Sequence, residues 1–125
     1  MSVYNIAQET LSKPYEYGVN DCNILALRVL DHIAGTEWST IAKYKSIRTG
    51  YNLLKKLGYE NTIDIIKEYA DEVTHGIDGD IWVNDNDKMS LALVMSHRLV
   101  CVNDSHTGFE LRQMNKQGTY YRIRK

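Results

Sequence analysis

The chain has 125 residues, 43% of them hydrophobic and 25% charged, with eight Gly, one Pro and two Cys. This composition is typical of one small globular domain, and it excludes fibrous, collagen-like and wholly disordered chains. Lys and Arg number 15 against 16 Asp and Glu, so the charge excess that drives binding to nucleic acids or anionic membranes is absent. We therefore expect a single domain over residues 1–125 that binds neither.

The first third of the sequence carries two helical patterns. A short helix over residues 5–12 is expected to end before Pro14, because a residue that precedes proline disfavours the helical region. A second helix begins at Asn20 or Asp21, either of which can cap it, and stops at Gly35. One arc of this helix is apolar and holds Cys22, Leu25, Ala26, Val29, Leu30 and Ile33. Cys22 is therefore expected to point inward from the first turn.

Two further helices and a set of strands follow. Apolar residues recur at helical spacing over residues 46–57 and 62–73, with Gly58 closing the first helix and Thr62 capping the second. After Gly76 the pattern becomes one of short strands and turns, with strands at 81–83, 91–95, 99–102, 109–111 and 120–123. Helices before strands favour the α+β class, with N-terminal helices packed on a C-terminal antiparallel sheet of four to five strands.

Localisation is predicted from what the sequence lacks. No apolar run approaches the ~20 residues of a membrane span, and residues 1–6 have neither the basic nor the apolar region of a signal peptide. We expect the protein to be made and kept in the reducing cytoplasm, without a signal peptide. In that compartment the two thiols, Cys22 and Cys101, are expected to stay unpaired.

Cys22 is the first candidate for chemistry. At the first turn of a helix, free backbone N–H groups and the positive end of the helix dipole favour a thiolate, which is how a nucleophilic thiol is built. A lone inward Cys is otherwise a small apolar residue that fills the groove between helix and sheet. The sequence around Cys22 favours the nucleophile.

The run from Pro14 to Cys22, Pro-Tyr-Glu-Tyr-Gly-Val-Asn-Asp-Cys, resembles the nucleophile segment of the NlpC/P60 cysteine peptidases. Residues 79–83, Gly-Asp-Ile-Trp-Val, resemble the Gly-Asp and apolar strand of the same superfamily, and residues 91–95 lie where its central strand should be. A small NlpC/P60-related group from phages and their hosts is more similar still, because its start reads aromatic-x-aromatic-Gly-x-x-Asp-Cys. The resemblance implies a papain-like α+β fold.

The resemblance also implies roles for single residues. Cys22 matches the nucleophile, and Tyr15, Tyr17 and Asp21 match the substrate-binding segment, in which Asp21 caps the helix rather than reacts. The superfamily places its general base, a His, at the start of the strand after Gly-Asp. Here that position falls near Met89, where no His stands. A thiol without a base loses the activation that makes it a useful nucleophile at neutral pH.

Four histidines could supply the base. His32 is excluded, because nearly three helical turns place it about 15 Å along the helix from Cys22. His106 in the last long turn is the first candidate, with Asp104 as a partner that orients it, and His97 in the preceding turn is the second. His75, in the loop before the Gly-Asp strand, is the third.

No cofactor or metal is expected. The sequence has no Cys-x-x-Cys or His-x-x-x-His pair of the kind that binds zinc. The acidic runs at residues 78–80 and 84–87 hint at calcium, but the second lacks the Gly and the terminal Glu of an EF-hand loop. Polar hairpin turns explain both runs more simply.

Three functions stay open. The first is a phage-type cysteine hydrolase, an amidase or endopeptidase, for which the resemblance implies peptidoglycan stem peptides as substrate. The second is a catalytically inactive component of a phage virion, in the tail or connector, which binds other phage structural proteins. The missing His favours the second, and the Asp21-Cys22 pair favours the first. The third is a peptide- or glycan-binding module that uses the groove at Tyr15 and Tyr17. The oligomeric state is not predicted.

Overall fold

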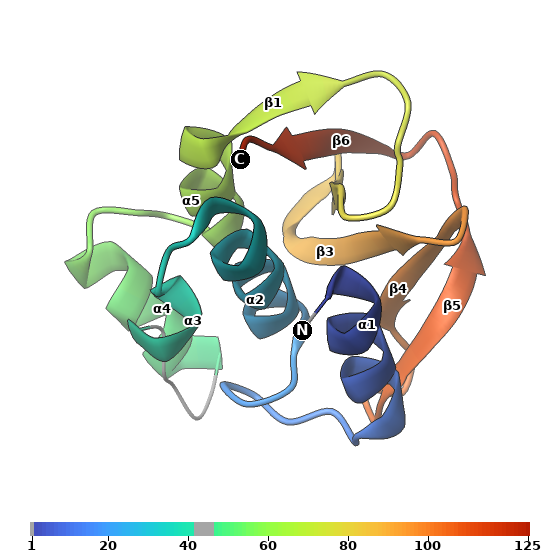
Figure 1. Cartoon of the computed structure of the whole chain (residues 1–125). Helices are drawn as coiled ribbons and strands as arrows, with labels where there is room; N and C mark the ends of the chain where they lie inside the picture. Colours follow the sequence, from blue (N-terminus) through green and yellow to red (C-terminus); the bar gives the residue numbers. More distant parts are fainter. Residues whose placement is uncertain (1, 42–46) are drawn as a thin grey trace.

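The computed structural model describes residues 2–41 and 47–125 (Figure 1). The described helices come first along the chain: α1 (Val3–Ser12), α2 (Cys22–Ala34), α3 (Trp38–Ile41), α4 (Ile47–Lys56) and α5 (Thr62–Tyr69). The strands follow: β1 (Ala70–Val73), β2 (Ile81–Asn84), β3 (Asp87–Met95), β4 (Arg98–Val102), β5 (Phe109–Gln113) and β6 (Gly118–Ile123). The α+β class is confirmed. None of these helices has the length and apolar character needed to cross a bilayer.

The strands form one antiparallel sheet in the order β1-β6-β2-β3-β4-β5. Among the residues that the structure describes it has six strands, so the prediction of four to five was wrong. The additional strand is β1, which lies in the segment predicted as the end of a helix over 62–73. The helix stops at Tyr69 because the backbone of Ala70 becomes extended and Ala70–Val73 pairs with β6. The apolar residues Ala70 and Val73 fit a helical period locally, but the long-range pairing decides the outcome.

The helices cover one face of the sheet (Figure 1). Along β3, side chains alternate between the two faces, as strand geometry requires. Leu91, Leu93 and Met95 face the helices and join the main core, whereas Ala92 and Val94 join a smaller cluster on the opposite face. That second cluster also contains Trp82, Leu99 and Tyr120.

Helix α2 has the ends that the sequence predicts. The side chain of Asp21 accepts a hydrogen bond from the N–H of Ile24, and Gly35 ends the helix with a φ of 74°. The short helix α3 was not predicted. The carboxylate of Asp31, near the end of α2, holds its start by accepting bonds from the N–H groups of Trp38 and Ser39. The helix predicted over 46–57 appears as α4. The first residue of the predicted range, Ser46, lies outside the described residues.

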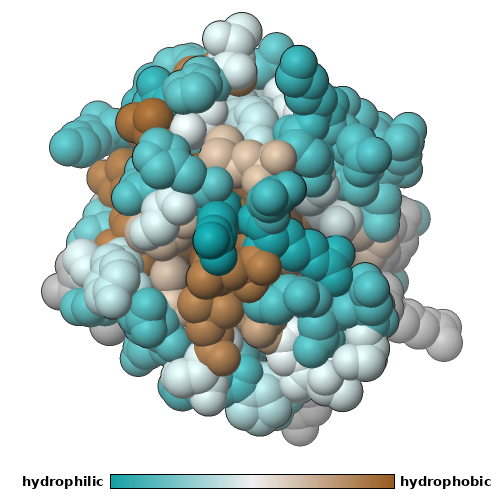
Figure 2. All heavy atoms as spheres, turned by 90° about the vertical axis from the view of Figure 1, so that its right-hand side faces the viewer, coloured by the Kyte–Doolittle hydropathy of each residue, from teal (hydrophilic) through white to brown (hydrophobic). Residues whose placement is uncertain are grey.

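The two edge strands carry charge. Asp71 and Glu72 lie on β1, and Glu110 and Arg112 lie on β5, which discourages pairing with another chain. Figure 2 shows the side of the molecule on which β4 and β5 lie, where hydrophilic residues surround a hydrophobic patch near the centre.

Strands β3 and β4 separate at one end of the sheet. A two-residue turn with positive φ at Ser96 and His97 joins them, but their pairing extends only as far as Leu93 with Val100. β3 nevertheless continues beside β2 back to Asp87, and β4 continues beside β5 up to Val102. The sheet therefore splits into two halves at this end, and the split forms the walls of the candidate site.

Candidate functional site

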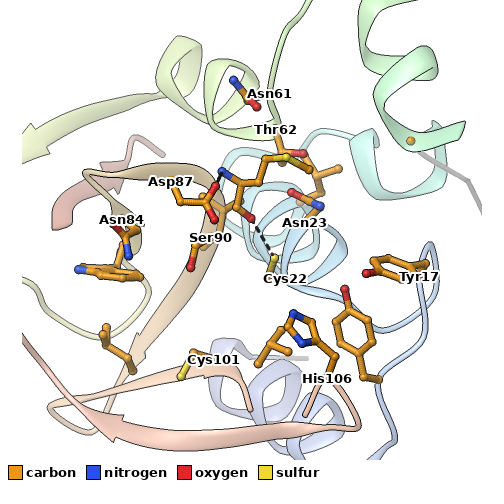
Figure 3. Close-up of a pocket in the computed structure, with 18 of the residues that line it drawn as sticks. Tyr17, Cys22, Asn23, Asn61, Thr62, Asn84, Asp87, Ser90, Cys101 and His106 are labelled. Carbon is orange, nitrogen blue, oxygen red and sulfur yellow. Dashed lines mark hydrogen bonds between the residues drawn. The ribbon is translucent and has the colours of Figure 1, made fainter. Parts of the chain in front are cut away.

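A cleft of about 570 Å³ lies where β3 and β4 separate (Figure 3). Its wall includes Leu91 from the helix side of the sheet and Trp82 and Leu99 from the opposite face. Residues from both faces of a sheet can line one cavity only where neighbouring strands part. The volume falls within the range of roughly 300–1,000 Å³ that is usual for ligand sites.

Cys22 stands at this cleft as the first residue of α2. The half-buried thiol donates a hydrogen bond to the carbonyl oxygen of Met89, with Sγ and O 3.4 Å apart (Figure 3). The N–H of Leu91 lies near the same sulfur and lowers its pKa. The start of β3, where the resemblance places a base, thus lies beside Cys22, and its backbone rather than a His meets the thiol.

The thiol of Cys22 is neutral in the structure. Burial, and to a smaller extent the nearby carboxylate of Asp21, raise its pKa to about 12. The N–H groups of Leu91, Cys22 and Asn23 lower the pKa, but they do not offset the burial. The helix N-terminus therefore supplies the donors that the sequence predicts, without making a thiolate. Such a thiol needs a base that takes its proton during reaction.

Asp21 acts as a structural carboxylate. It is 1% exposed, and its Oδ1 accepts from the N–H of Ile24 at 2.7 Å. Its Oδ2 accepts from the N–H of Gly18 at 2.8 Å, which fixes the turn before the helix. The predicted role as helix cap is confirmed. Asp21 does not line the cleft, so the structure does not place it against a substrate there.

Tyr15 and Tyr17 form an aromatic wall of the cleft. Their rings meet edge to face at 5.0 Å, and both line the cleft beside Cys22. Asn20 fixes the segment that carries them, because its side-chain amide donates to the carbonyl groups of Thr10, Lys13 and Pro14. The sequence offered Asn20 only as an alternative cap. Burial is the main cause that raises the pKa of Tyr15, and the Tyr17 side chain and the charge of Cys22 add to it.

His106 comes to the same cleft from the loop between β4 and β5. Its ring meets the ring of Tyr15 edge to face at 5.8 Å, and the N–H of Tyr15 donates to the carbonyl of the neighbouring Thr107. In Figure 3 the side chains of Cys22 and His106 both point into the space between α2 and this loop. The structure therefore brings together the predicted nucleophile and the first candidate for its base.

The β4–β5 loop is held by Asn103, which the sequence analysis missed. Its Oδ1 accepts from the N–H of Thr107 at 3.0 Å, and its Nδ2 donates to the Oγ1 of the same residue at 3.1 Å. The N–H of His106 donates to the carbonyl of Asn103. His106 itself has a φ of 55°, a left-handed conformation that non-glycine residues adopt rarely. Where they do adopt it, they are often at functional sites. An Asn at the start of a turn, four residues before a Thr, was the signal available in the sequence.

The other predicted residues lie elsewhere. His97 is in the turn that follows Met95, six residues along β3 from Met89 and thus about 20 Å from the carbonyl that holds Cys22. His75 is an exposed loop residue outside the cleft lining. Asp104 does not orient His106 through any bond seen among the described residues, and instead pairs with Arg112 at 2.9 Å on the surface.

The acidic run at residues 78–80, which was considered for calcium, has structural roles. Asp80 is 2% exposed and receives two bonds from the guanidinium of Arg122, while its Oδ2 also accepts from the N–H of Ile77. The side chain of Asp78 accepts from the N–H of Ser96. Within residues 2–41 and 47–125, no three His, Cys, Asp or Glu side chains gather in a way that could bind a metal ion.

Comparison with known proteins identifies the family. No curated protein and no solved structure matches the chain. A family model described as Domain of unknown function (DUF6950) matches residues 3–123, which is nearly the whole chain. The protein therefore belongs to the DUF6950 family.

Proposed function

We propose that this domain is a cysteine hydrolase of the NlpC/P60 kind, an amidase or endopeptidase with Cys22 as its nucleophile and His106 as its general base. One observation carries the proposal: Cys22 and His106, which are far apart in the sequence, line the same cleft. Tyr15 lies beside both, since its ring contacts that of His106 and it lines the cleft together with Cys22.

The reaction uses groups that are already in place. As the sulfur of Cys22 attacks the carbonyl carbon of an amide, a C–S bond forms and the thiol proton passes to the ring of His106. Backbone N–H groups at the start of α2 stabilise the negative oxygen of the tetrahedral intermediate. The C–N bond then breaks, and His106 returns the proton to the leaving amine. Water hydrolyses the thioester with His106 again as the base, which restores the thiol.

The neutral state of the thiol makes the base essential. A sulfur whose pKa is about 12 cannot attack as a preformed thiolate near neutral pH, so its proton must move as the C–S bond forms. General-base assistance of this kind contributes roughly 10²–10⁴-fold to a rate. The substrate must also displace the bond between the thiol and the Met89 carbonyl.

The resemblance to the NlpC/P60 group supplies the proposed substrate. Stem peptides of peptidoglycan are short chains of amide bonds, and the aromatic wall of Tyr15 and Tyr17 gives the cleft apolar surface against which such a chain can lie. Tyr rings provide large contact areas together with a polar edge.

A second candidate function has an observation of its own. The neutral thiol, bonded to a strand carbonyl, also fits a domain that keeps this fold without catalysis. In that case the protein is a structural part of a phage virion and binds other virion proteins.

Hydrolysis of purified peptidoglycan separates the two candidates. The assay measures amines released by the wild type, by Cys22→Ser and by His106→Asn, in which Asn tolerates the left-handed backbone. The matched control is His97→Asn, which also replaces a His with positive φ but lies outside the cleft. We expect both cleft variants to lose roughly 10²-fold or more of the activity, and the control to keep it. Absence of amine release by the wild type contradicts the hydrolase and favours the structural component.

A further inference from the structure

The strand register defines which backbone groups face the cleft. β3 and β4 pair at Met95 with Arg98 and at Leu93 with Val100, in steps of two residues. Backbone N–H and C=O groups of alternate residues in a strand point to the same side. Leu91 on β3 and Val102 on β4 would therefore form the next pair if the ladder continued. It stops, so among the described residues these two have no strand partner across the split.

Both residues line the cleft, one on each wall. On the β3 wall, Cys22 already occupies part of the unpaired edge, because its thiol donates to the carbonyl of Met89 and lies near the N–H of Leu91. On the β4 wall, the bonds to β5 are made from the other side of the strand, so Val102 keeps its N–H and C=O toward the cleft. The nucleophile thus lies beside a strand edge that lacks a partner.

We propose that the cleft binds an extended peptide chain as an additional strand along the edge of β4 at Val102, with the peptide passing Cys22. This inference rests on the proposed function and names the form of its substrate. Unpaired strand edges bind extended chains through main-chain hydrogen bonds, and side-chain pockets then add specificity. A chain in this position lies in the plane of the sheet, between residues of both faces that line the cleft.

Chloromethyl ketones test this geometry without turnover. The sulfur of Cys22 displaces chloride from the reagent, so that a C–S bond forms, the C–Cl bond breaks and the thiol proton leaves to His106 or solvent. The probe is N-acetyl-Ala-Ala-Ala chloromethyl ketone, and its matched control carries a methyl group on every amide nitrogen. Mass spectrometry follows labelling of Cys22, with Cys101 on the same cleft as an internal comparison.

We expect the unmethylated reagent to label Cys22 at least about tenfold faster, because methylation removes main-chain hydrogen bonds and a tenfold change corresponds to about 1.4 kcal/mol. Val102→Pro removes the N–H of the β4 edge and should abolish the difference, with circular dichroism as the check on folding. Equal rates for the two reagents overturn the proposal whether or not the variant folds.

The variant His106→Asn separates this inference from the proposed function. In His106→Asn both rates fall by the same factor if the hydrolase proposal holds. If neither rate falls, that proposal fails while the ratio of reagents still tests the strand.

Discussion

Replacing Asp21 tests how the start of α2 is built. Its carboxylate accepts two backbone bonds while only 1% exposed, one from Ile24 and one from Gly18. Asp21→Asn keeps an acceptor for Ile24, and Asn is as good a helix cap as Asp. Its amide NH₂ then faces the N–H of Gly18, so one bond to a charged acceptor is lost, at a cost of about 1.5–3 kcal/mol.

Asp21→Ala removes both bonds. The additional loss of the cap costs about 1 kcal/mol more, so the Ala variant should be the less stable of the two. Urea denaturation measures the stability of both variants. A loss of about 2 kcal/mol in the free energy of unfolding lowers the urea midpoint by roughly 1 M at the usual slope of that free energy with urea concentration. Asp64→Asn, in the first turn of α5, is the matched control and should change stability by less than about 1 kcal/mol.

The same variants test the electrostatics of the thiol. Removing the charge of Asp21 should lower the pKa of Cys22 from its value of about 12 in both variants. Alkylation of Cys22 in the folded protein should therefore become faster at a given pH. The reasoning is refuted if Asp21→Asn is as unstable as Asp21→Ala, or if the alkylation of Cys22 is unchanged in both.

Three further predictions follow from packing and charge. Gly118→Ala places a Cβ 2.1 Å from Nε1 of Trp82 and 2.4 Å from the carbonyl of Val83, so we expect thermal denaturation to show a loss of at least about 2 kcal/mol; Gly108→Ala, whose Cβ meets nothing closer than 3.8 Å, should change little. Between about pH 9 and pH 12 the unfolded chain loses the Cys22 proton while the folded chain keeps it, so the stability of the wild type falls as pH rises. Urea denaturation of Cys22→Ala should show a shallower decline of stability with pH. Equal declines in the wild type and the variant would contradict the raised pKa. Arg122→Gln should lower the urea midpoint more than Arg124→Gln, because it leaves the buried carboxylate of Asp80 without its ion-pair partner, whereas the partner of Arg124, Asp71, is exposed to solvent. The reverse order would contradict this account.

Local signals made much of the fold predictable. The Asp21 cap and the Gly35 stop define α2 because both act within one helical turn. The turn at Ser96 and His97 follows similarly from two adjacent apolar runs. β1 was missed because Ala70–Val73 has no strand pattern of its own and becomes a strand only through β6.

The candidate site was predictable in part. Cys22, Tyr15 and Tyr17 are close in sequence, so a motif could place them together. His106 reaches them only because β3 and β4 separate and Asn103 shapes the following loop, which no local pattern records. The state of the thiol also depends on distant residues, since β3 buries the sulfur and raises its pKa.

The pH dependence of Cys22 alkylation by iodoacetamide tests the central claim most directly. Mass spectrometry compares Cys22 with Cys101 in the wild type and in His106→Asn. If His106 acts as the base, Cys22 reacts near neutral pH far faster than a thiol with a pKa of about 12 can, and His106→Asn removes about 10²-fold of that rate. A Cys22 that stays inert until strongly alkaline pH, with no effect of His106→Asn, would contradict the hydrolase.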